Sequence, residues 1–275
     1  MTAIPHIPIL LGAYYYTWYG IGEQWSLFPR PWQPTLGEYK SADRAVMEQH
    51  HKWAKLAGID FFSVSWGGDG TRSAVNKHIA ASGSCIIIDS AGNHIRPHCD
   101  EGGPKHDHVY RFEGWREPSM WWEPSGDVDT LIQAHLAIPD GVPMALHYEV
   151  RDVLGVGEGF VDLSAGSNPA ILMHHLLYAA SNIFSHPSYF KIGGRPVLFL
   201  YTLRDFVNFV APLKAALDAV ERVIGTPLFL VGDVVWWSPA ADALPWDDYR
   251  RIGLSAITGY NLFDWGQPDK MGAGL

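Results

Sequence analysis

The chain has 275 residues, of which 47% are hydrophobic, 13% aromatic and 18% charged, and its formal net charge is -9. This composition suits one large α/β domain or two small ones, and we favour a single domain over residues 1–275. The negative charge argues against nucleic acid and anionic membrane surfaces as partners, and no apolar run approaches the ~20 residues that span a bilayer.

Cysteine usage and the N-terminus bear on the compartment. Cys85 and Cys99 are the only cysteines, too few for a disulfide framework. The N-terminus lacks the charged, apolar and small-residue order of a secretory signal, so the sequence as given predicts a cytoplasmic protein. The 12 Trp, 12 Tyr and 12 Phe with few charges are typical of a surface that binds weakly polar rings such as sugars.

Short apolar or aromatic runs alternate along the chain with segments of helical period, which predicts βα units and a parallel sheet. The predicted strands are residues 9–16, 59–65, 144–149, 196–201, 228–233 and 256–260. The predicted helices are residues 41–57, 73–81, 170–184 and 211–223. Ser41 or Asp43 can cap the first helix, and Gly58 supplies its left-handed stop.

Residues at about 83–130 break this rhythm. Residues 86–89 favour an extra strand, and the Gly-, Pro- and His-rich remainder predicts an irregular insertion, which at this length usually has a function or is disordered. Its potential metal ligands are His94, His98, Cys99, Asp100, His106 and His108. Their spacing matches no closed zinc motif, so a solvated insertion is the favoured interpretation, and we predict no metal and no cofactor.

The carboxyl ends of parallel strands are where functional side chains converge. Aromatic residues follow every predicted strand, and four strand ends add an acidic residue or histidine: His147, Glu149, Asp152, Asp205, Asp233 and Asp264. Rings stack on the C–H faces of sugars, and carboxylates and phenols bind their hydroxyls, so the mixture indicates a glycan cleft. Phosphate-loop, dinucleotide and G-x-S-x-G patterns are absent.

Each of these residues also has a purely structural interpretation. Tyr14 and Tyr16 can fill a barrel while Tyr15 packs under helices. Glu149 and Asp152 can form the carboxylate pair of a glycosidase, with the two groups roughly 5–10 Å apart. Alternatively, Glu149 only orients His147 or a substrate hydroxyl, and Asp152 pairs with a neighbouring arginine or caps a turn.

Five segments carry a family resemblance: "GAYYYTWYG", "LGEYKSADRAVMEQHHKWAKLAGIDFFSVSWGG", "ALHYEV", "SHPSYFKIGGRPVLFLYT" and "AITGYNLFDW". In this order they resemble glycoside hydrolase family 99, the endo-α-mannosidases, and related glycan-processing barrels, over most of 8–82 and 134–265. The resemblance implies a (β/α)₈ TIM-barrel-like α/β fold. It also implies hydrolysis of α-mannosidic linkages by a metal-independent retaining route, with a substrate hydroxyl as internal nucleophile and two carboxylates as base and acid.

The resemblance also implies substrate-binding residues. Those carried over are Tyr15, Trp18, Tyr19, Trp66, His147 and Tyr260, with Tyr201 added from the fourth strand end. His147 and Glu149 match the family's His-x-Glu after the third strand.

Two departures from the family pattern stand out. The family's catalytic motif resembles Asn-Glu-Trp-His-Glu after an eighth strand, and this chain has neither that motif nor more than about six predicted strands. The second departure is the insertion at 83–130. We therefore expect a C-terminally incomplete barrel, as in a fragment of a longer protein. The alternative is that the insertion supplies replacement strands. An active chain would use Glu149 with Asp152 or Asp264. The rival functions are a non-catalytic carbohydrate-binding barrel and an accessory domain in polysaccharide assembly.

Overall fold

The computed structural model describes part of the chain, and every structural statement below refers to that part. The described residues are 9–17, 19, 25, 32–68, 86–88, 94–97, 125–149, 160–166, 168–234 and 244–259.

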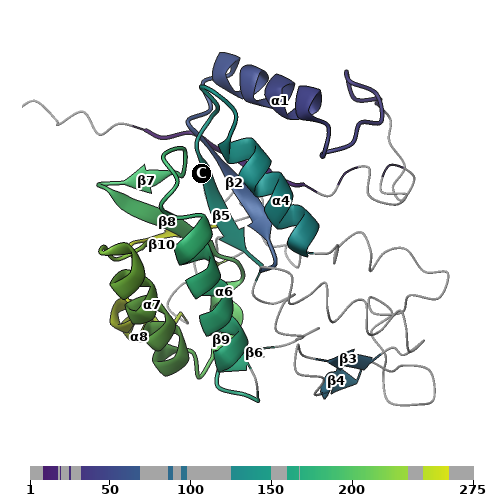
Figure 1. Ribbon diagram of the computed structural model, residues 1–275. Coiled ribbons are helices and arrows are strands. Elements are labelled where there is room, and N and C mark those ends of the chain that lie inside the picture. The colour runs from purple at the N-terminus through teal and green to yellow at the C-terminus, as the bar shows by residue number, and fades with distance from the viewer. Residues whose placement is uncertain are drawn as a thin grey trace, which may run out of the picture.

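A curved sheet of six parallel strands forms the centre of the molecule (Figure 1). In spatial order the strands are β1 (Gly12–Tyr15), β2 (Phe61–Trp66), β5 (Met144–Tyr148), β8 (Arg195–Leu200), β10 (Phe229–Asp233) and β11 (Ala256–Thr258). A short strand, β7 (Lys191–Ile192), pairs antiparallel with β8. Because each parallel strand lies beside its predecessor in the chain, the sheet has the strand order of a TIM-like barrel over six strands.

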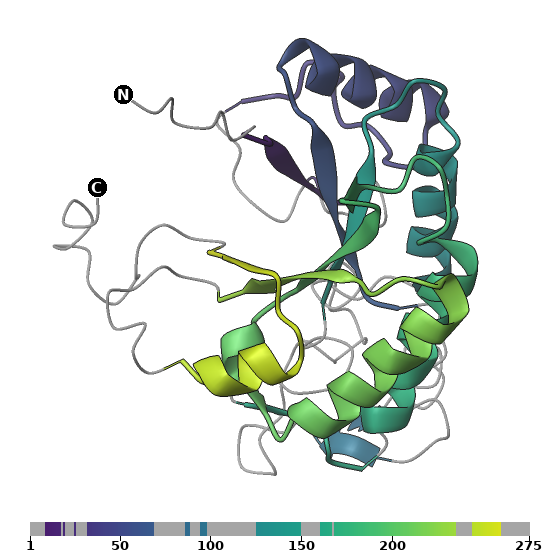
Figure 2. The same ribbon diagram turned by 90° about the vertical axis from the view of Figure 1, so that its left-hand side faces the viewer.

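The helices lie on the convex side of this sheet (Figure 2). They are α1 (Arg44–Leu56), α4 (Ser125–Leu136), α6 (Asn168–Asn182), α7 (Val210–Ile224) and α8 (Trp246–Arg251), with a 3₁₀ turn η3 at Leu203–Asp205. Two small sheets lie apart from the central one: β6 (Val161–Asp162) with β9 (Phe206–Val207), and β3 (Ile86–Ile88) with β4 (His94–Pro97). The expected α/β, partial TIM-barrel architecture is confirmed.

Most predicted elements are confirmed, with ends that differ by at most three residues. All six predicted strands are present in the central sheet, and the predicted helices at 41–57, 170–184 and 211–223 correspond to α1, α6 and α7. The predicted helix 73–81 lies outside the described residues. The strand predicted at 86–89 is β3, which pairs antiparallel with β4 instead of joining the central sheet.

One boundary was wrong. The irregular insertion was predicted to extend to about residue 130, but α4 begins at Ser125. Its opening turn contains glycine and aspartate, which indicate a loop when considered alone. The helix forms because Ile132 and Leu136 are buried against the central sheet, so tertiary packing outweighs local propensity. The six-residue helix α8 was also missed, since it is too short to show a helical period.

Helix α1 follows directly from its sequence. Met47, His51 and Ala54 share one buried face, and the chain leaves the helix through Gly58 at a φ of 73°. Asp43 is the N-cap residue, but its side chain makes no capping hydrogen bond. The Ser41 hydroxyl instead accepts a hydrogen bond from the Tyr19 amide at 3.2 Å, which fixes the path of the chain before the helix.

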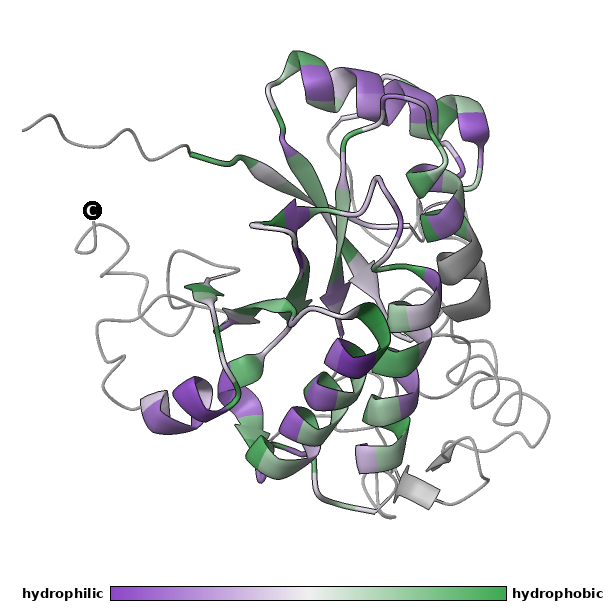
Figure 3. Ribbon diagram, turned by 60° about the vertical axis from the view of Figure 1, so that its left-hand side comes forward, coloured by the Kyte–Doolittle hydropathy of each residue, from purple (hydrophilic) through white to green (hydrophobic). Residues whose placement is uncertain are grey.

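The main core lies between the sheet and the helices. Alternate residues of the inner strands are buried there, for example Val64, Leu146 and Leu198, each at most 1% exposed. Figure 3 shows hydrophobic residues along the central strands, whereas the helices are hydrophobic on some faces and hydrophilic on others. This packing makes the sheet a rigid support for the residues at its carboxyl ends.

Tyr189 joins two strands of the sheet through its hydroxyl. The hydroxyl accepts a hydrogen bond from the Leu146 amide at 2.9 Å and donates one to the Val197 carbonyl at 2.6 Å. The side chain is 3% exposed, so no water replaces these bonds. Tyr189→Phe should therefore lower the free energy of unfolding by about 2–4 kcal/mol, because a buried donor and a buried acceptor lose their partner. Urea denaturation measures this, and a loss below about 0.5 kcal/mol contradicts it.

Candidate functional site

The two faces of the central sheet carry different side chains. Tyr15 faces the helices, where its ring contacts His135 of α4 at 4.8 Å between centroids. Since side chains alternate along a strand, Tyr14 lies on the opposite, concave face. The register pairs Tyr14 with Ser63, and the same alternation places His147 and Asp233 on that face. The concave face therefore collects polar residues from separate strands.

His147 is the centre of this group. Its Nδ1 lies 3.1 Å from the Ser63 hydroxyl, and its Nε2 lies 3.5 Å from Oδ2 of Asp233. Its ring stacks on Phe199 with centroids 5.6 Å apart and an interplanar angle of 6°. His147 is 3% exposed and Asp233 is fully buried. Burial lowers the pKa of His147 to about 3, so the imidazole is neutral at pH 7.

Two tyrosine rings contact the His147 ring. Tyr14 approaches it with centroids 5.3 Å apart and an angle of 53°, and Tyr201 with 5.5 Å and 59°. Tyr14 is 40% exposed and Tyr201 is half-buried. These two rings, which come from β1 and from the residue just after β8, present aromatic surface near the carboxyl ends of the strands. Such tilted arrangements are favourable for aromatic pairs.

Glu149 adds a carboxylate at the end of β5. Its amide donates a hydrogen bond to the Trp66 carbonyl at 3.0 Å, so the ladder between β2 and β5 continues one residue past the strand. By alternation, Glu149 lies on the same face as His147, one step closer to the strand tips. Its side chain is partly exposed, which makes it accessible to a ligand.

Phenylalanine rings close the amino-terminal side of the concave face. Phe61 stacks on Phe190 with centroids 4.1 Å apart and an angle of 7°, and lies 6.0 Å from Phe199. The concave face thus changes from apolar rings at the amino ends of the strands to Tyr14, His147 and Glu149 toward the carboxyl ends. This gradient directs a polar ligand to the carboxyl ends of the strands.

The structure places three of the predicted site residues on the concave face: His147 and Tyr201, whose rings are in contact, and Glu149, by alternation along β5. It places two others on the helix side. Tyr15 is 8% exposed, its hydroxyl lies 3.0 Å from Nδ1 of His50, and burial raises its pKa. Tyr15 therefore packs under the helices, which is the structural interpretation that the sequence left open for it. Trp66 is fully buried, with its ring 5.4 Å from that of Tyr148.

Tyr19 lies beyond β1 in a separate aromatic group. Its ring is 4.6 Å from that of Trp25 and 5.9 Å from that of Tyr39. The remaining predicted site residues are outside the described part of the chain and stay predictions: Trp18, Asp152, Tyr260 and Asp264.

Sequence reasoning did not select Tyr14 or Ser63 for the site, and it collected Asp233 only among the acidic residues at strand ends. Asp233 stands out in the sequence as an acidic residue that ends an apolar strand, and it belonged to the acidic residues collected at strand ends. Ser63 gives no such signal, because a serine inside a strand is common. Tyr14 could be chosen over Tyr15 only by knowing which face of β1 is covered.

Gly68 follows β2 at a position that only glycine fits. Its φ is 102°, and a Cβ there would overlap the ring of His175 on α6. His175 in turn lies 2.8 Å from the Tyr148 hydroxyl in the core. We expect Gly68→Ala to destabilise the protein by about 2–4 kcal/mol through backbone strain and displacement of His175. Thermal unfolding measures this; Gly166→Ala is the matched comparison, since it has positive φ but open space, and should cost less.

Among the described residues, no group of three or more His, Cys, Asp or Glu side chains could hold a metal ion. Apart from His94 in β4, the histidine-rich candidate cluster lies outside them. The described helices include none with the length and hydropathy to cross a bilayer.

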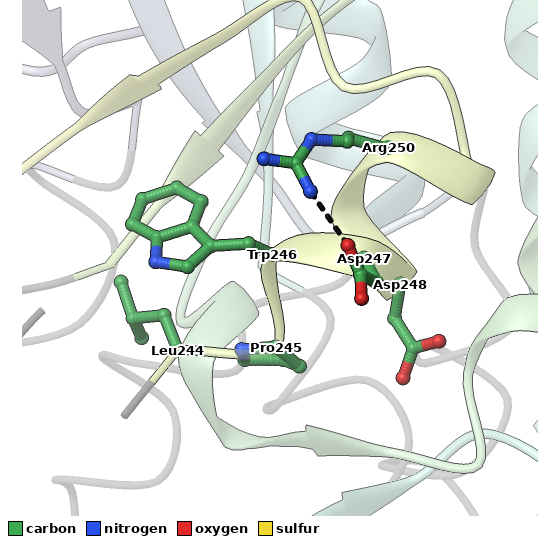
Figure 4. Close-up of a pocket in the computed structure, with 6 residues that line it drawn as sticks. All are labelled: Leu244, Pro245, Trp246, Asp247, Asp248 and Arg250. Atoms are coloured by element: carbon green, nitrogen blue, oxygen red, sulfur yellow. Dashed lines mark hydrogen bonds and ion pairs between the residues drawn. The ribbon is translucent and has the colours of Figure 1, made fainter. Parts of the chain in front are cut away.

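A surface depression of about 450 Å³ lies at the start of α8 (Figure 4). Trp246 and Leu244 border it, and Arg250 forms an ion pair with Asp247 at 2.6 Å. The depression is formed by one short helix and the two residues before it, and none of the concave-face residues lines it. It does not belong to the candidate site.

Comparison with solved structures finds similar folds. One structure, described as a glycoside hydrolase-like protein, superposes with a TM-score of 0.55 at 18% identity, over 93% of this chain and 59% of that one. The chain has a glycoside hydrolase-like fold. No family model and no curated protein sequence matches it.

Two further similar structures are of a GH99 endo-α-mannosidase from Bacteroides thetaiotaomicron, one of them in complex with bis-tris-propane. Both share 14% identity with this chain, cover 90% of it, and have TM-scores of 0.49 and 0.47. The chain spans 58–60% of the length of these three structures.

Proposed function

We propose that the protein acts on α-linked, mannose-type glycans at the carboxyl ends of its parallel strands, by a metal-independent retaining mechanism. The observation that supports this most is that strand alternation puts a partly exposed carboxylate, Glu149, on the same face of the sheet as the contacting rings of Tyr14, His147 and Tyr201. The glycoside hydrolase-like fold supports the same proposal, because barrels of this type have their sites at this end.

The chemistry of the group suits a sugar. Tyr14 and Tyr201 offer ring faces on which the C–H face of a pyranose stacks, and their hydroxyls and Glu149 bind sugar hydroxyls. For hydrolysis, one carboxylate takes the proton of a neighbouring sugar hydroxyl, whose oxygen displaces the leaving group at the anomeric carbon. A second carboxylic acid protonates the departing oxygen. Water then opens the ring that the attacking hydroxyl oxygen has formed with the anomeric carbon. Glu149 provides one of these groups, and Asp152 or Asp264 the other.

Asp233 is not a candidate acid or base in this proposal. It is fully buried beneath His147, so a glycan cannot reach it. This burial also favours the second candidate function, a carbohydrate-binding barrel without hydrolysis, because the carboxylate nearest His147 among the described residues is inaccessible.

Incubation with α-mannooligosaccharides separates the two candidates, with β-mannan as the control glycan. Release of reducing ends with retained anomeric configuration, followed by proton NMR, supports the hydrolase. Saturable binding of α-mannosides by calorimetry without turnover supports the binder. Absence of both binding and turnover, or equal binding of β-mannan, overturns the proposal of an α-mannoside site.

A further inference from the structure

His147 receives a polar neighbour at each ring nitrogen from a different strand. Ser63 is on β2, next to β5, whereas Asp233 is on β10, two strands away on the other side. These side chains converge on one imidazole because the sheet curves toward its concave face. A flat sheet would leave Asp233 too far away to approach the ring, since neighbouring strands lie about 4.8 Å apart.

The two neighbours determine where the imidazole carries its proton. Nε2 of His147 and Oδ2 of Asp233 are both buried and lie 3.5 Å apart, too far for a hydrogen bond, so their contact is electrostatic. An ionised Asp233 attracts an N–H and repels a nitrogen lone pair, which favours the hydrogen on the ring nitrogen that faces it. A neutral imidazole has one N–H, and therefore Nδ1 accepts the hydroxyl proton of Ser63. Ser63 then donates a hydrogen bond to Nδ1, and the Nε2–H points toward Asp233 without forming a hydrogen bond.

We propose that Ser63 and Asp233 are positioning residues that lock His147 in the Nε2–H tautomer, and that the locked ring holds Tyr14 and Tyr201 as the walls of the ligand site. The second half of this inference rests on the proposed function; the first half does not. His147 is then a support for the site and not a proton donor or acceptor for the substrate, because both of its nitrogens face protein groups.

Packing around the ring explains why the lock matters. The terminal torsion of a histidine is broad and roughly two-fold, so an imidazole without polar partners can flip. Phe199 lies parallel to the ring, while Tyr14 and Tyr201 lean against it at angles of 53° and 59°. Rotation of the imidazole out of this orientation would disturb its contacts with both tyrosine rings.

Nitrogen-15 NMR of histidine-labelled protein tests the lock without any ligand. In the unsubstituted protein we expect His147 to show a protonated Nε2 and an unprotonated Nδ1 from pH 5 to pH 8. Ser63→Ala should produce a mixture of tautomers, whereas Ser63→Thr keeps the hydroxyl, suits a strand, and should preserve the single tautomer. Ser65→Ala removes a hydroxyl from the same strand, at the position paired with His147 in the register, and should leave the single tautomer of His147 unchanged.

Binding measurements test the second half. Ser63→Ala should weaken binding of an α-mannooligosaccharide about five- to tenfold, and Ser63→Thr should restore it, because one hydrogen bond that orders the site is lost and regained. An Nδ1–H tautomer in the unsubstituted protein, or titration of His147 near pH 6.5, overturns the lock. If His147 keeps the Nε2–H tautomer in the unsubstituted protein but no variant binds the glycan, the proposed function is refuted and the tautomer lock stands. If all variants, including Ser63→Ala, keep both the single tautomer and the glycan affinity, the role of Ser63 is refuted.

Discussion

Under the proposed hydrolase function, replacement of Glu149 by glutamine is expected to lower the rate of α-mannoside hydrolysis by about 10²–10⁴-fold, the usual contribution of a positioned acid or base. Glutamine has the same shape but cannot accept or release a proton near neutral pH. Affinity for the glycan should stay within a few fold, because the rings of Tyr14 and Tyr201 are unchanged. Single-turnover rates and calorimetric binding of the same oligosaccharide measure the two effects separately.

The matched control is Glu221→Gln on the exposed surface of α7, on the convex side of the sheet. This change removes one carboxylate of the same type and should leave both rate and affinity unaltered. Equal rates for the Glu149 variant and the unsubstituted protein would assign Glu149 to substrate orientation and leave the acid and base to other carboxylates. A parallel loss of binding and rate would indicate that the side chain only binds the glycan.

Lowering the pH from 7 to 5 is expected to reduce the free energy of unfolding by about 5 kcal/mol through three buried histidines. Burial lowers the pKa of His51 to about 4, helped by His50 and Lys55, and that of His135 to about 3. Burial also lowers the pKa of His147 to about 3. In the unfolded chain all three have their ordinary pKa of 6.5.

The sign follows from proton binding. Below pH 6.5 these histidines bind protons in the unfolded chain, whereas in the folded chain they bind them only near pH 4 or 3. Their contribution to stability is therefore full above pH 6.5 and falls as the pH drops. Each histidine contributes about 1.4 kcal/mol per pH unit in this window. The total is comparable with the stability of many domains.

His51 and His135 form a connected pair between α1 and α4. The Val142 amide donates to Nδ1 of His51 at 2.8 Å, so Nε2 of His51 carries the hydrogen and donates to Nδ1 of His135 at 2.9 Å. Protonation of either acceptor nitrogen breaks this series of hydrogen bonds. Acid should therefore loosen α4 from α1 as well as weaken the whole fold.

Urea denaturation at pH 7 and pH 5 measures the acid effect. His135→Gln removes one of the three groups and should reduce the loss by about a third, even though the variant is less stable at pH 7. His174→Gln, at an exposed position of α6, should leave the difference between the two pH values unchanged. Equal stability of the unsubstituted protein at both pH values would show that these histidines are hydrated or already protonated in the folded state.

The positions of the strands could be predicted because each central strand is a short apolar run, covered by helices on one face and by neighbouring rings on the other. The start of α4 could not, since its first turn resembles a loop and only contact with the sheet stabilises it. For the site, Glu149 and His147 were predictable as polar residues at the tip of an apolar strand. The fold also brings Tyr201 to them, whereas Tyr15 and Trp66 belong to the core between sheet and helices.

Composition, period and the residues at strand ends determined that this chain forms a parallel α/β sheet with aromatic and acidic carboxyl ends. Tertiary structure decided which tyrosine of β1 faces the concave side, because a two-residue period has two phases and only burial of Tyr15 against α4 selects one. It also decided that Ser63, His147 and Asp233 meet. Contacts between strands distant in sequence depend on the curvature of the sheet, and no local pattern encodes that curvature.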